Sequence, residues 1–424
     1  MTLGNSLWIG VSGLIAHGEA MSTVGDNIAN VSTIGFKKER ASFNDILGGE
    51  FVNNRGGGGA YLGANQTLWQ QGTLTQTGNP MDVGINGQGM FVVSGQHLGR
   101  DQQYLTRDGR FQLDSSGMMV DQHGMHVQGY TVTNGTKSSL GDLNLGKTLS
   151  PALPTTTAKI AMNLKADPTH TLSPFDPNDP KTVDYKTSIQ VTDSLGKSHQ
   201  VTLQYVNNGG GQFDVHATVD GSDIGGAAGT QVEIGTGTMS FNTDGSLQVT
   251  NPDPMTFTTS FTNATPGQAV TLDYGSIAAG GTGREGAQMS SNDSTTASVD
   301  VDGHGAGSLT DVKINPNGSI EGVFDNGDSF EIGRLAIADV QNYEGLSRQG
   351  DSLYTTSRES GQAVIDEAGT GGRGATMSGT LEQSNVDISS ELVTMIAYQR
   401  AFQANGKTVS TADEMMQEVV NLKR

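Results

Sequence analysis

Apolar and small residues recur every three or four positions near the N-terminus of the chain. This spacing places them on one face of an α-helix, and the face consists of Leu7, Val11, Leu14, Gly18, Met21, Gly25 and Ile28. Trp8, Ile15 and Val24 widen this stripe, and Ser6 is suited to cap the start of the helix. Polar residues and glycine after position 29 end the pattern. The sequence therefore predicts a helix from about Leu7 to Ile28.

The C-terminal region repeats the same spacing over a longer stretch. From Asp387 onward, a second stripe runs through Leu392, Met395, Phe402, Val409, Met416 and Val420. Gln399, Gly406 and Asp413 interrupt this stripe at seven-residue intervals, which is unfavourable for a self-sufficient dimeric coiled coil. We therefore expect the C-terminal helix to pack against a different partner helix.

Between the two ends, the pattern changes to short alternating runs that are separated by turn signals. One example is the run from Tyr104 to Thr106, which is followed by Asp108-Gly109 and by a second run from Arg110 to Leu113. Turn signals that begin with Asp or Asn and end with Gly recur in five further segments, which are Asp114 to Gly117, Asp121 to Gly124, Asn242 to Gly245, Asn315 to Gly318 and Asp325 to Gly327. These segments predict β-hairpins.

The pattern predicts a mainly β, multidomain fold with paired terminal α-helices. A Pro/Thr-rich joint at 151–157 and a Gly-rich joint at 277–286 bracket a block with strand-like runs at 188–192 and 200–206. We interpret this block as an inserted domain, so that each outer domain is built from both chain ends. The predicted segments are a core helix (1–47), a Gly-rich linker (48–77), the first half of an inner β domain (78–147), an inserted β domain (148–286), the second half of the inner β domain (287–375) and a second core helix (376–424).

Composition and charge exclude several classes of function. Glycine is abundant, with 60 residues, while charged residues make up only 16% of the chain, which favours β structure with many turns. The net charge of −20 would repel phosphate backbones and anionic lipids, so we expect no nucleic-acid partner and no membrane insertion. There is no cysteine, so no disulfide is predicted. The first Lys or Arg is Lys37, so no basic segment precedes an apolar one and no cleaved signal peptide is predicted.

No catalytic or cofactor motif is convincing. Two segments match G-x-G-x-x-G, at 281–286 and 369–374, but neither lies between a predicted buried strand and a helix. His123 and His126 lie three positions apart around Gly124, where alternating geometry places them on opposite faces. We expect no enzyme activity, no cofactor and no metal site.

The stripes on the terminal helices are the remaining candidate site. The simplest interpretation is an ordinary helix pair within one chain. However, helices joined through a Gly-rich linker bury little surface against their own body and are marginal alone, which favours a role in assembly. The predicted subunit-interface residues are Leu7, Val11, Leu14, Met21, Ile28, Leu392, Met395, Phe402, Val409 and Met416. The predicted hinge residues are Gly48, Gly56, Gly57, Gly58 and Gly59.

Several motifs resemble a known family, the bacterial flagellar rod and hook proteins. Near the N-terminus they are Ser12 to Leu14, Asp26 to Asn30 and Thr33 to Lys37. In the β region they are Gly78 to Val83, Ile85 to Gly89, Thr106 to Phe111, Val127 to Tyr130, Asn342 to Leu346 and Gly350 to Asp351. Near the C-terminus they are Gly379 to Asp387, Glu391 to Val393, Gln399 to Ala401 and Ala412 to Met415.

The resemblance implies a mechanical role. Residues 155–163, followed by the inserted block, resemble hook proteins, whereas a rod subunit would be shorter. A hook subunit would be exported unfolded through the flagellar export apparatus to the extracellular side. It would polymerise beneath a hook cap into a curved, flexible tube that transmits torque as a universal joint. Its neighbours would be other copies, the rod and the hook-filament junction proteins, with the terminal helices lining the tube and the linker letting them tilt.

Two alternatives stay open at this point. A distal rod subunit would share the terminal helices. A secreted adhesin or binding module belongs to another class and would keep its activity without those helices.

Overall fold

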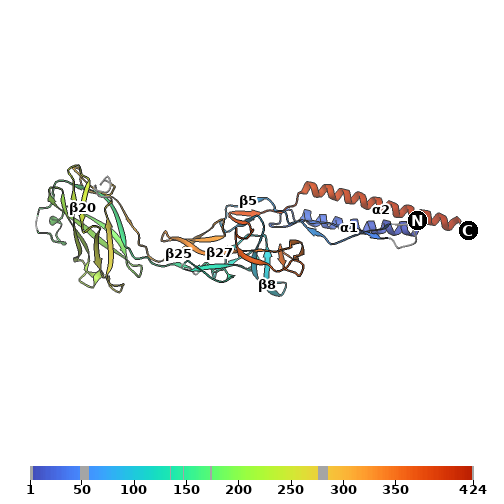
Figure 1. Cartoon of the computed structure of the whole chain (residues 1–424), viewed down its shortest axis with the longest axis horizontal. Helices are drawn as coiled ribbons and strands as arrows, with labels where there is room; N and C mark the ends of the chain where they lie inside the picture. Colours follow the sequence, from blue (N-terminus) through green and yellow to red (C-terminus); the bar gives the residue numbers. More distant parts are fainter. Residues whose placement is uncertain are drawn as a thin grey trace. The chain divides into compact units, whose positions relative to one another are not determined.

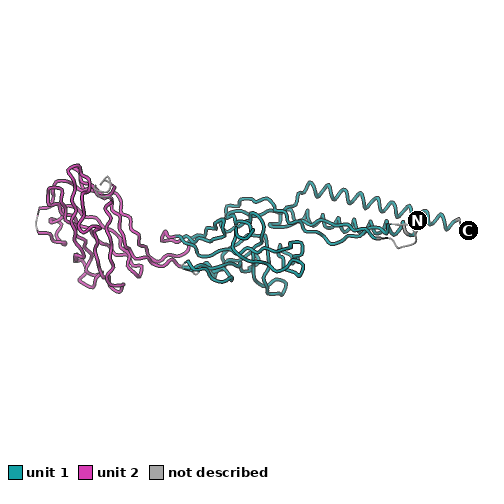
Figure 2. Tube along the Cα trace, viewed as in Figure 1, with its two compact units in different colours: residues 1–148, 310–323, 329–424 teal, residues 149–309, 324–328 magenta. Residues whose placement is uncertain are grey.

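The computed structural model describes residues 3–47, 57–133, 135–146, 148–171, 174–275 and 285–422. The chain divides into two compact units (Figure 2). Unit 1 contains residues 1–148, 310–323 and 329–424, and unit 2 contains residues 149–309 and 324–328. The predicted fold class is confirmed, because strands dominate both units and the two terminal helices pack together in unit 1. None of the described helices is long and apolar enough to cross a membrane.

The terminal helices are α1 (Leu3–Ala29) and α2 (Ile388–Leu422). They lie side by side and run in opposite directions (Figure 1). Glycine permits their close approach, because a Cβ atom added to Gly10 would lie 2.8 Å from Cγ2 of Val409. Asp387 caps the start of α2, where its carboxylate accepts a hydrogen bond from the backbone N–H of Ser390 at 3.1 Å.

A β-hairpin packs along α1. It consists of β2 (Phe43–Leu47) and β3 (Gly57–Leu62). The backbone N–H of Ala60 donates to Oγ of Ser12 at 3.3 Å, and a Cβ atom on Gly59 would lie 2.1 Å from the same hydroxyl oxygen. The hairpin and α1 therefore form one packed layer.

This arrangement differs from the predicted Gly-rich linker. Gly57, Gly58 and Gly59 lie in the paired strand β3 and not in an unstructured linker. At Gly59 the absence of a Cβ atom allows the backbone to approach α1, whereas a Cβ atom at Gly57 would meet no other atom within 4 Å. Gly48 and Gly56 lie outside the described residues. The rest of the segment contains β4 (Gln66–Thr67), which pairs with β1 (Glu39–Arg40), and β5 (Leu74–Gln76), which pairs with β32 (Thr380–Glu382).

The β body of unit 1 combines strands from both halves of the chain. Its sheet includes the order β25-β26-β27-β11-β7-β8-β29-β28, in which β25 spans Gly307–Ile314. These strands are β26 (Ser319–Phe324), β27 (Ser329–Asp339), β11 (His126–Thr133), β7 (Met90–His97), β8 (Arg100–Thr106), β29 (Leu353–Thr355) and β28 (Ser347–Gly350). Shorter strands at its margins are β6 (Val83–Asn86), β9 (Gln112–Leu113), β10 (Met119–Val120), β12 (Thr136–Lys137), β13 (Gly141–Asp142), β30 (Val364–Glu367) and β31 (Ala375–Ser378).

Unit 2 contains two five-stranded sheets around one apolar core. The first is an antiparallel meander of β16 (Tyr185–Thr192), β17 (Ser198–Gly209), β18 (Gln212–Asp220), β19 (Gln231–Phe241) and β20 (Leu247–Asn251). The second consists of β21 (Met255–Thr259), β22 (Gln268–Asp273), β15 (Thr157–Lys165), β23 (Ala287–Ser290) and β24 (Thr295–Val301). Outside these sheets, β14 (Leu149–Ser150) pairs with β25 (Gly307–Ile314).

The inserted domain is longer than the sequence predicts. Its predicted end was residue 286, but β23 and β24 both pair with β15. They therefore complete a sheet of unit 2, which extends to residue 309. The Gly-rich stretch that suggested the earlier boundary lies between β22 and β23, within unit 2.

Candidate assembly interface on the terminal helices

The predicted interface residues fall into two groups. Seven are half-buried, and they are Leu7, Val11, Leu14, Met21, Ile28, Met395 and Val409. The other three lie on α2 and are exposed, with fractions of 46% for Leu392, 41% for Phe402 and 39% for Met416. The helix pair therefore covers only part of the predicted stripe.

Further apolar side chains on these helices are exposed. On α1, Trp8 and Ile15 lie seven positions apart and are 60% and 58% exposed. On α2 the exposed apolar residues include Ile388, Val393, Ile396, Met415, Val419 and Val420. The sequence analysis assigned Trp8 and Ile15 to the α1 stripe and Val420 to the α2 stripe, but it did not predict Ile388, Val393, Ile396, Met415 and Val419 as exposed apolar residues. The four-residue spacing of Ile388, Leu392 and Ile396 is the signal that could have revealed this second face.

A polar clamp holds the end of α1 to the start of α2. Asn27 is 1% exposed, and its Nδ2 donates to Oε2 of Glu391 at 3.2 Å and to the backbone oxygen of Glu39 at 2.7 Å. Nζ of Lys38 lies 3.3 Å from Oε1 of the same Glu391 carboxylate. These contacts fix the crossing point of the two helices. The sequence motifs contain Asn27 and Glu391 but not Lys38, and nothing in the spacing of these residues assigned them this role.

A buried ion triad anchors the helices to the β body. Oε1 of Glu382 lies 2.5 Å from Nζ of Lys37, and its Oε2 lies 2.8 Å from Nη1 of Arg107. The backbone N–H of Gly72 also donates to Glu382 at 2.8 Å. All three charged side chains are almost fully buried, and burial lowers the pKa of Lys37 despite the adjacent carboxylate. The triad joins segments from three distant parts of the sequence.

An aromatic cluster joins α1, α2 and the hairpin. The ring of His17 lies 5.1 Å from that of Phe43 and 5.9 Å from that of Tyr398. Nδ1 of His17 is buried and has no hydrogen-bond partner among the described atoms. Burial lowers the pKa of His17, so the neutral ring packs here as an apolar group.

The histidine pair in the β region does not form a joint site. Nδ1 of His123 lies 3.5 Å from Asp121, whereas Nδ1 of His126 lies 2.9 Å from Asp142. Within the described parts of the chain, no group of three or more potential metal ligands converges. Each histidine therefore has its own carboxylate partner.

The glycine motif at 369–374 forms a turn between β30 and β31 and does not open a helix. The backbone N–H of Gly369 donates to the oxygen of Gly374 at 3.0 Å. Nη1 of Arg373 donates to the backbone oxygen of Thr370 at 3.2 Å. The loop is closed on itself and does not have the geometry of a phosphate cradle. The other motif, at 281–286, lies partly outside the described residues.

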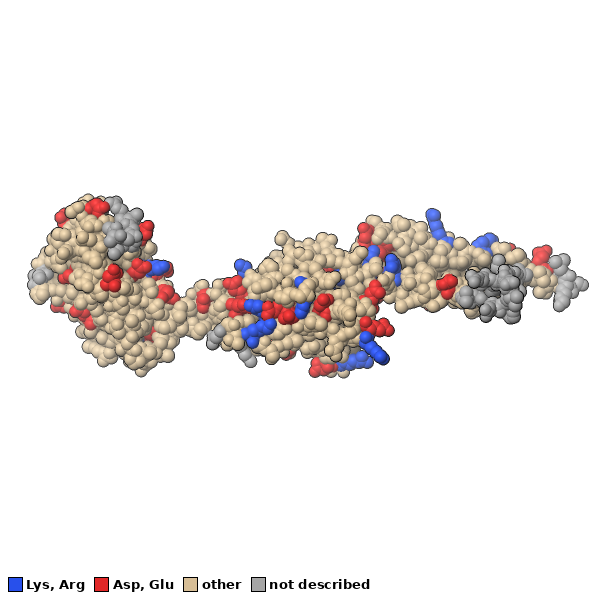
Figure 3. All heavy atoms as spheres, viewed as in Figure 1, with Lys and Arg blue, Asp and Glu red and all other residues tan. Residues whose placement is uncertain are grey.

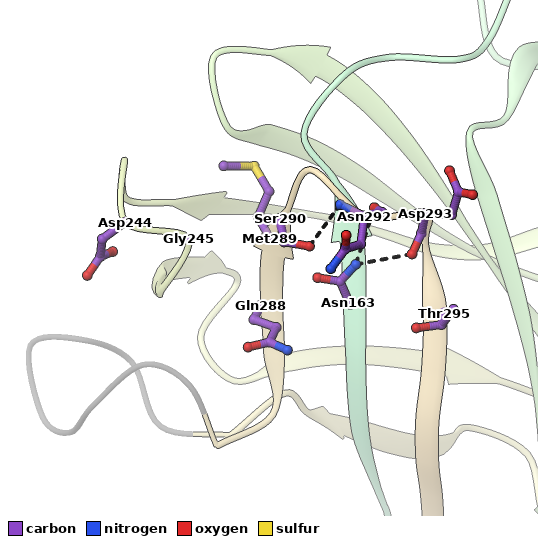
Figure 4. Close-up of a pocket in the computed structure, with 9 residues that line it drawn as sticks. All are labelled: Asn163, Asp244, Gly245, Gln288, Met289, Ser290, Asn292, Asp293 and Thr295. Atoms are coloured by element: carbon purple, nitrogen blue, oxygen red, sulfur yellow. Dashed lines mark hydrogen bonds between the residues drawn. The ribbon is translucent and has the colours of Figure 1, made fainter.

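A polar cavity of about 600 Å³ lies in unit 2 (Figure 4). Nδ2 of Asn163 donates to the backbone oxygens of Asn292 at 3.4 Å and Asp293 at 3.2 Å. The two carboxylates in its lining belong to Asp244 and Asp293, and Asp293 is paired with Lys165. The lining offers amides, hydroxyls and carboxylates but no histidine or nucleophile–base pair. We assign no chemistry to this cavity.

The charges of the chain are distributed unevenly between the units. Unit 2 has 18 acidic and 6 basic residues in its sequence, and red side chains outnumber blue ones on the face of unit 2 shown in Figure 3. Unit 1 shows both signs on that face, and it contains a network in which Arg334 binds Glu331 and Glu367. The acidic surplus is therefore concentrated in unit 2.

Comparison with known proteins shows four family matches along the chain. Residues 7–37 match the family "Flagella basal body rod protein", and residues 377–422 match "Flagellar basal body rod FlgEFG protein C-terminal". Residues 84–163 match "Flagellar hook protein FlgE/F/G D1 domain", and residues 154–304 match "Flagellar basal body protein FlaE D2 domain". The last match covers most of unit 2.

Whole-chain relatives decide the family. The flagellar hook protein FlgE of Escherichia coli is 31% identical, and the match covers 97% of this chain and 98% of that protein. This chain belongs to the flagellar hook protein family. The hook protein FlgE of Salmonella typhimurium is also 31% identical over 97% of this chain and 98% of that protein, and the hook protein FlgE of Treponema pallidum is 32% identical over 99% of both chains.

Membership in the hook family confirms two expectations from the sequence. The chain is a structural protein of the extracellular flagellar hook and not an enzyme. The resemblance to hook proteins is also confirmed, because the whole-chain match to a hook protein includes the inserted domain as well as the terminal helices.

Proposed function

We propose that this protein polymerises through its terminal helices into the flagellar hook, a curved tube that acts as a universal joint and transmits torque from the rod to the filament. The observation that carries this proposal is the apolar surface that the helix pair leaves exposed, above all Trp8, Ile15 and Val393, which are 60%, 58% and 67% exposed. Large exposed apolar surfaces mark interaction sites. Contact with neighbouring copies would bury this surface.

The two groups of predicted interface residues have different roles in this proposal. The half-buried group, which includes Leu14 and Val409, holds α1 against α2 within one copy. The exposed group, which includes Leu392, Phe402 and Met416, contacts other copies together with Trp8 and Ile15. Because apolar contacts are non-directional, neighbours can shift slightly against one another at small individual cost as the tube bends.

The hairpin of β2 and β3 moves with the helices in this proposal. The contacts of Ser12 with Ala60 and of His17 with Phe43 tie the hairpin to α1. A hinge at Gly57 to Gly59 would break these contacts. We therefore propose that the helices and the hairpin tilt as one body.

Further partners follow from the place of a hook subunit in the flagellum. We propose export in an unfolded state through the flagellar export apparatus. We also propose polymerisation beneath the hook cap, attachment to the rod at one end of the tube and to hook-filament junction proteins at the other. The apolar helix surface that a single copy leaves exposed supports contacts of this kind at both ends of the tube.

Electron microscopy of the full-length protein, concentrated with a precipitating salt that strengthens apolar burial, tests the proposal. The unaltered chain is expected to form curved tubes. Ile15→Asp and Val393→Asp each place a charge in the proposed contact. They are expected to raise the concentration needed for tubes by about 100-fold or more, because an unpaired buried charge costs about 3–5 kcal/mol.

Val393→Ile is the matched control, since it keeps an apolar side chain at the same position, and it is expected to assemble. The chain has two tryptophans, Trp8 and Trp69, so Trp69→Phe leaves Trp8 as the single tryptophan. Its fluorescence emission should shift to shorter wavelength on assembly. Tubes from both aspartate variants at wild-type concentrations would show that the helices do not carry the interface.

A further inference from the structure

The turn between β7 and β8 has an unusual residue at its tip. His97 pairs with Arg100, so Leu98 and Gly99 form a two-residue turn. Both have a positive φ, 48° for Leu98 and 77° for Gly99. This backbone suits Asn-Gly or Gly-Gly, whereas a leucine side chain crowds its own backbone in the left-handed region. Leu98 is therefore locally unfavourable at this position.

Leu98 is also unfavourably exposed. It is 80% exposed, the largest fraction among the large apolar side chains in the described residues. Leucine at this position is unfavourable both for the backbone conformation and for exposure to water. Residues that are locally unfavourable in this way concentrate at functional sites. Among the described residues, no part of the same copy buries the Leu98 side chain.

The turn is held rigidly in place. The hydroxyl of Tyr104, a residue that is 1% exposed, donates to the backbone oxygens of His97 at 3.3 Å and Arg100 at 3.1 Å. On the other side, Nε2 of His97 lies 3.1 Å from the backbone oxygen of Gln349 in β28. Both ends of the turn are therefore fixed by buried or neighbouring groups. A fixed apolar side chain loses little conformational entropy when it binds.

The surroundings of Leu98 resemble the rim of a protein interface. Arg100, Asp101 and Asp351 lie around the turn and are exposed, and an apolar centre within a polar rim is the usual anatomy of such contacts. Arg100 forms no ion pair with any described residue of its own copy. It faces outward from a chain whose copies each have a net charge of −20, which favours an acidic surface of another copy as its partner.

We propose that Leu98 is a contact residue between copies of this chain. Its side chain inserts into an apolar hollow on a second copy, and Arg100 pairs with a carboxylate at the edge of that hollow. This contact lies on the β body and is separate from the helix surface described above. The inference rests on the proposed polymerisation, because it requires a second copy at this distance from the helices.

Three substitutions at one position test this contact. Leu98→Asn and Leu98→Gly suit the left-handed backbone, so they keep the turn while removing the apolar side chain. Each is expected to raise the concentration needed for tubes by about 10- to 100-fold, the loss expected for one buried leucine. The melting temperature of the free protein should stay the same or rise. Leu98→Met keeps the apolar side chain and is expected to assemble like the unaltered chain.

A label at the same position identifies the partner. The chain has no cysteine, so a Leu98→Cys variant accepts one environment-sensitive fluorophore or one photo-crosslinker. On tube formation the fluorophore emission should shift to shorter wavelength, and the crosslinker should join two copies of the chain, as identified by mass spectrometry.

The outcomes separate this inference from the proposed function. Tubes that form at unchanged concentration from both Leu98→Asn and Leu98→Gly would overturn the contact while leaving the helix interface intact. A label that stays in water within tubes, or that crosslinks only to another flagellar protein added to the mixture, would also overturn it. Failure of the unaltered chain to form any tube would overturn the proposed function, and the Leu98 contact with it.

Discussion

Unit 2 and the terminal helices of unit 1 bury their apolar side chains to very different degrees. In unit 2, the two sheets enclose a core in which Leu164, Val201 and Leu203 are fully buried. On α2, by contrast, Glu391 and Ala412 are the only described residues that are buried, while nine large apolar side chains are exposed. The same chain therefore contains a unit with a complete core and a helix pair without one.

The difference indicates where the free energy of folding comes from in each region. A domain of the size of unit 2 can bury enough apolar surface to fold on its own. Helices of this kind depend on packing for most of their stability, because propensity alone is marginal in water. The helix pair is held at its base by the polar clamp and the ion triad, and its remaining stability would come from neighbouring copies. Three measurements of unfolding stability test this difference between the two regions.

The largest effect is expected at the ion triad. Among the described residues, Glu382 provides the only carboxylate that contacts both Lys37 and Arg107, so Glu382→Gln leaves two buried cations without a counter-ion. Breaking such a pair should lower the free energy of unfolding of unit 1 by about 3–5 kcal/mol. Unit 2 should melt unchanged, because the substitution is remote from its core. Calorimetry of the full chain, with separate transitions for the two units, measures both effects.

Glu331→Gln is the control for this substitution. Glu331 is half-exposed and pairs with Arg334, so its loss should change the stability of unit 1 by less than about 1 kcal/mol. Equal losses in the two variants would mean that the triad is not the anchor of the helices.

A smaller effect is expected in the core of unit 2. Leu203 is 0% exposed and lies in β17, so Leu203→Ala should lower the free energy of unfolding of unit 2 by about 2–5 kcal/mol. Unit 1 and tube formation should be unaffected at temperatures where unit 2 stays folded. Leu195→Ala, at a side chain that is 67% exposed, should change stability by less than about 0.5 kcal/mol. A matching loss in unit 1 would show that the two units do not unfold independently.

The sequence patterns predicted the helices and most of the turns well, but they predicted the structural roles of several glycines poorly. Five of the six proposed turns connect paired strands, among them Asn242 to Gly245 between β19 and β20. The sixth, at Asp108-Gly109, is wrong, because β8 pairs with β7 through Leu98-Gly99. A Cβ atom at Gly109 would lie 1.8 Å from the backbone oxygen of Val83. Gly109 is therefore needed for close packing of two segments and not for a turn.

Packing between segments that are distant in the sequence also explains which parts of the site were not predicted. Gly57 to Gly59 suggest flexibility in the sequence, yet they lie in a strand that packs on α1. Asn27 and Glu391 are 364 positions apart, and no local pattern indicates that they meet. Periodicity reports which face of an element is apolar, but it does not report which residues from distant segments share that face. Leu98 was also not singled out from the sequence. Leucine is recognised as unfavourable there only once the structure shows that residues 98 and 99 form the turn.

The smallest of the three effects concerns acid stability, and it again separates the two regions. Burial alone would raise the pKa of Asp184 in unit 2, but hydrogen bonds from the backbone N–H groups of Asn207, Thr169 and His170 outweigh burial and hold its pKa below the usual range. A depressed pKa in the folded state means that the carboxylate stabilises unit 2 above the unfolded value of about 3.9. This contribution is lost as the pH falls through the lower, folded pKa.

Asp184→Asn should therefore lower the free energy of unfolding of unit 2 by about 1–3 kcal/mol at pH 7, because an amide cannot accept all of these hydrogen bonds. The difference from the unaltered chain should shrink as the pH falls below the unfolded value of about 3.9 and through the lower, folded pKa of Asp184, where the folded carboxylate becomes protonated. Asp293→Asn removes a carboxylate that is 89% exposed and should have no measurable effect at either pH. Urea unfolding followed by circular dichroism at pH 7 and pH 3 measures these differences. A constant difference between the two pH values would show that the charge of Asp184 does not stabilise unit 2, and that its role there is confined to packing.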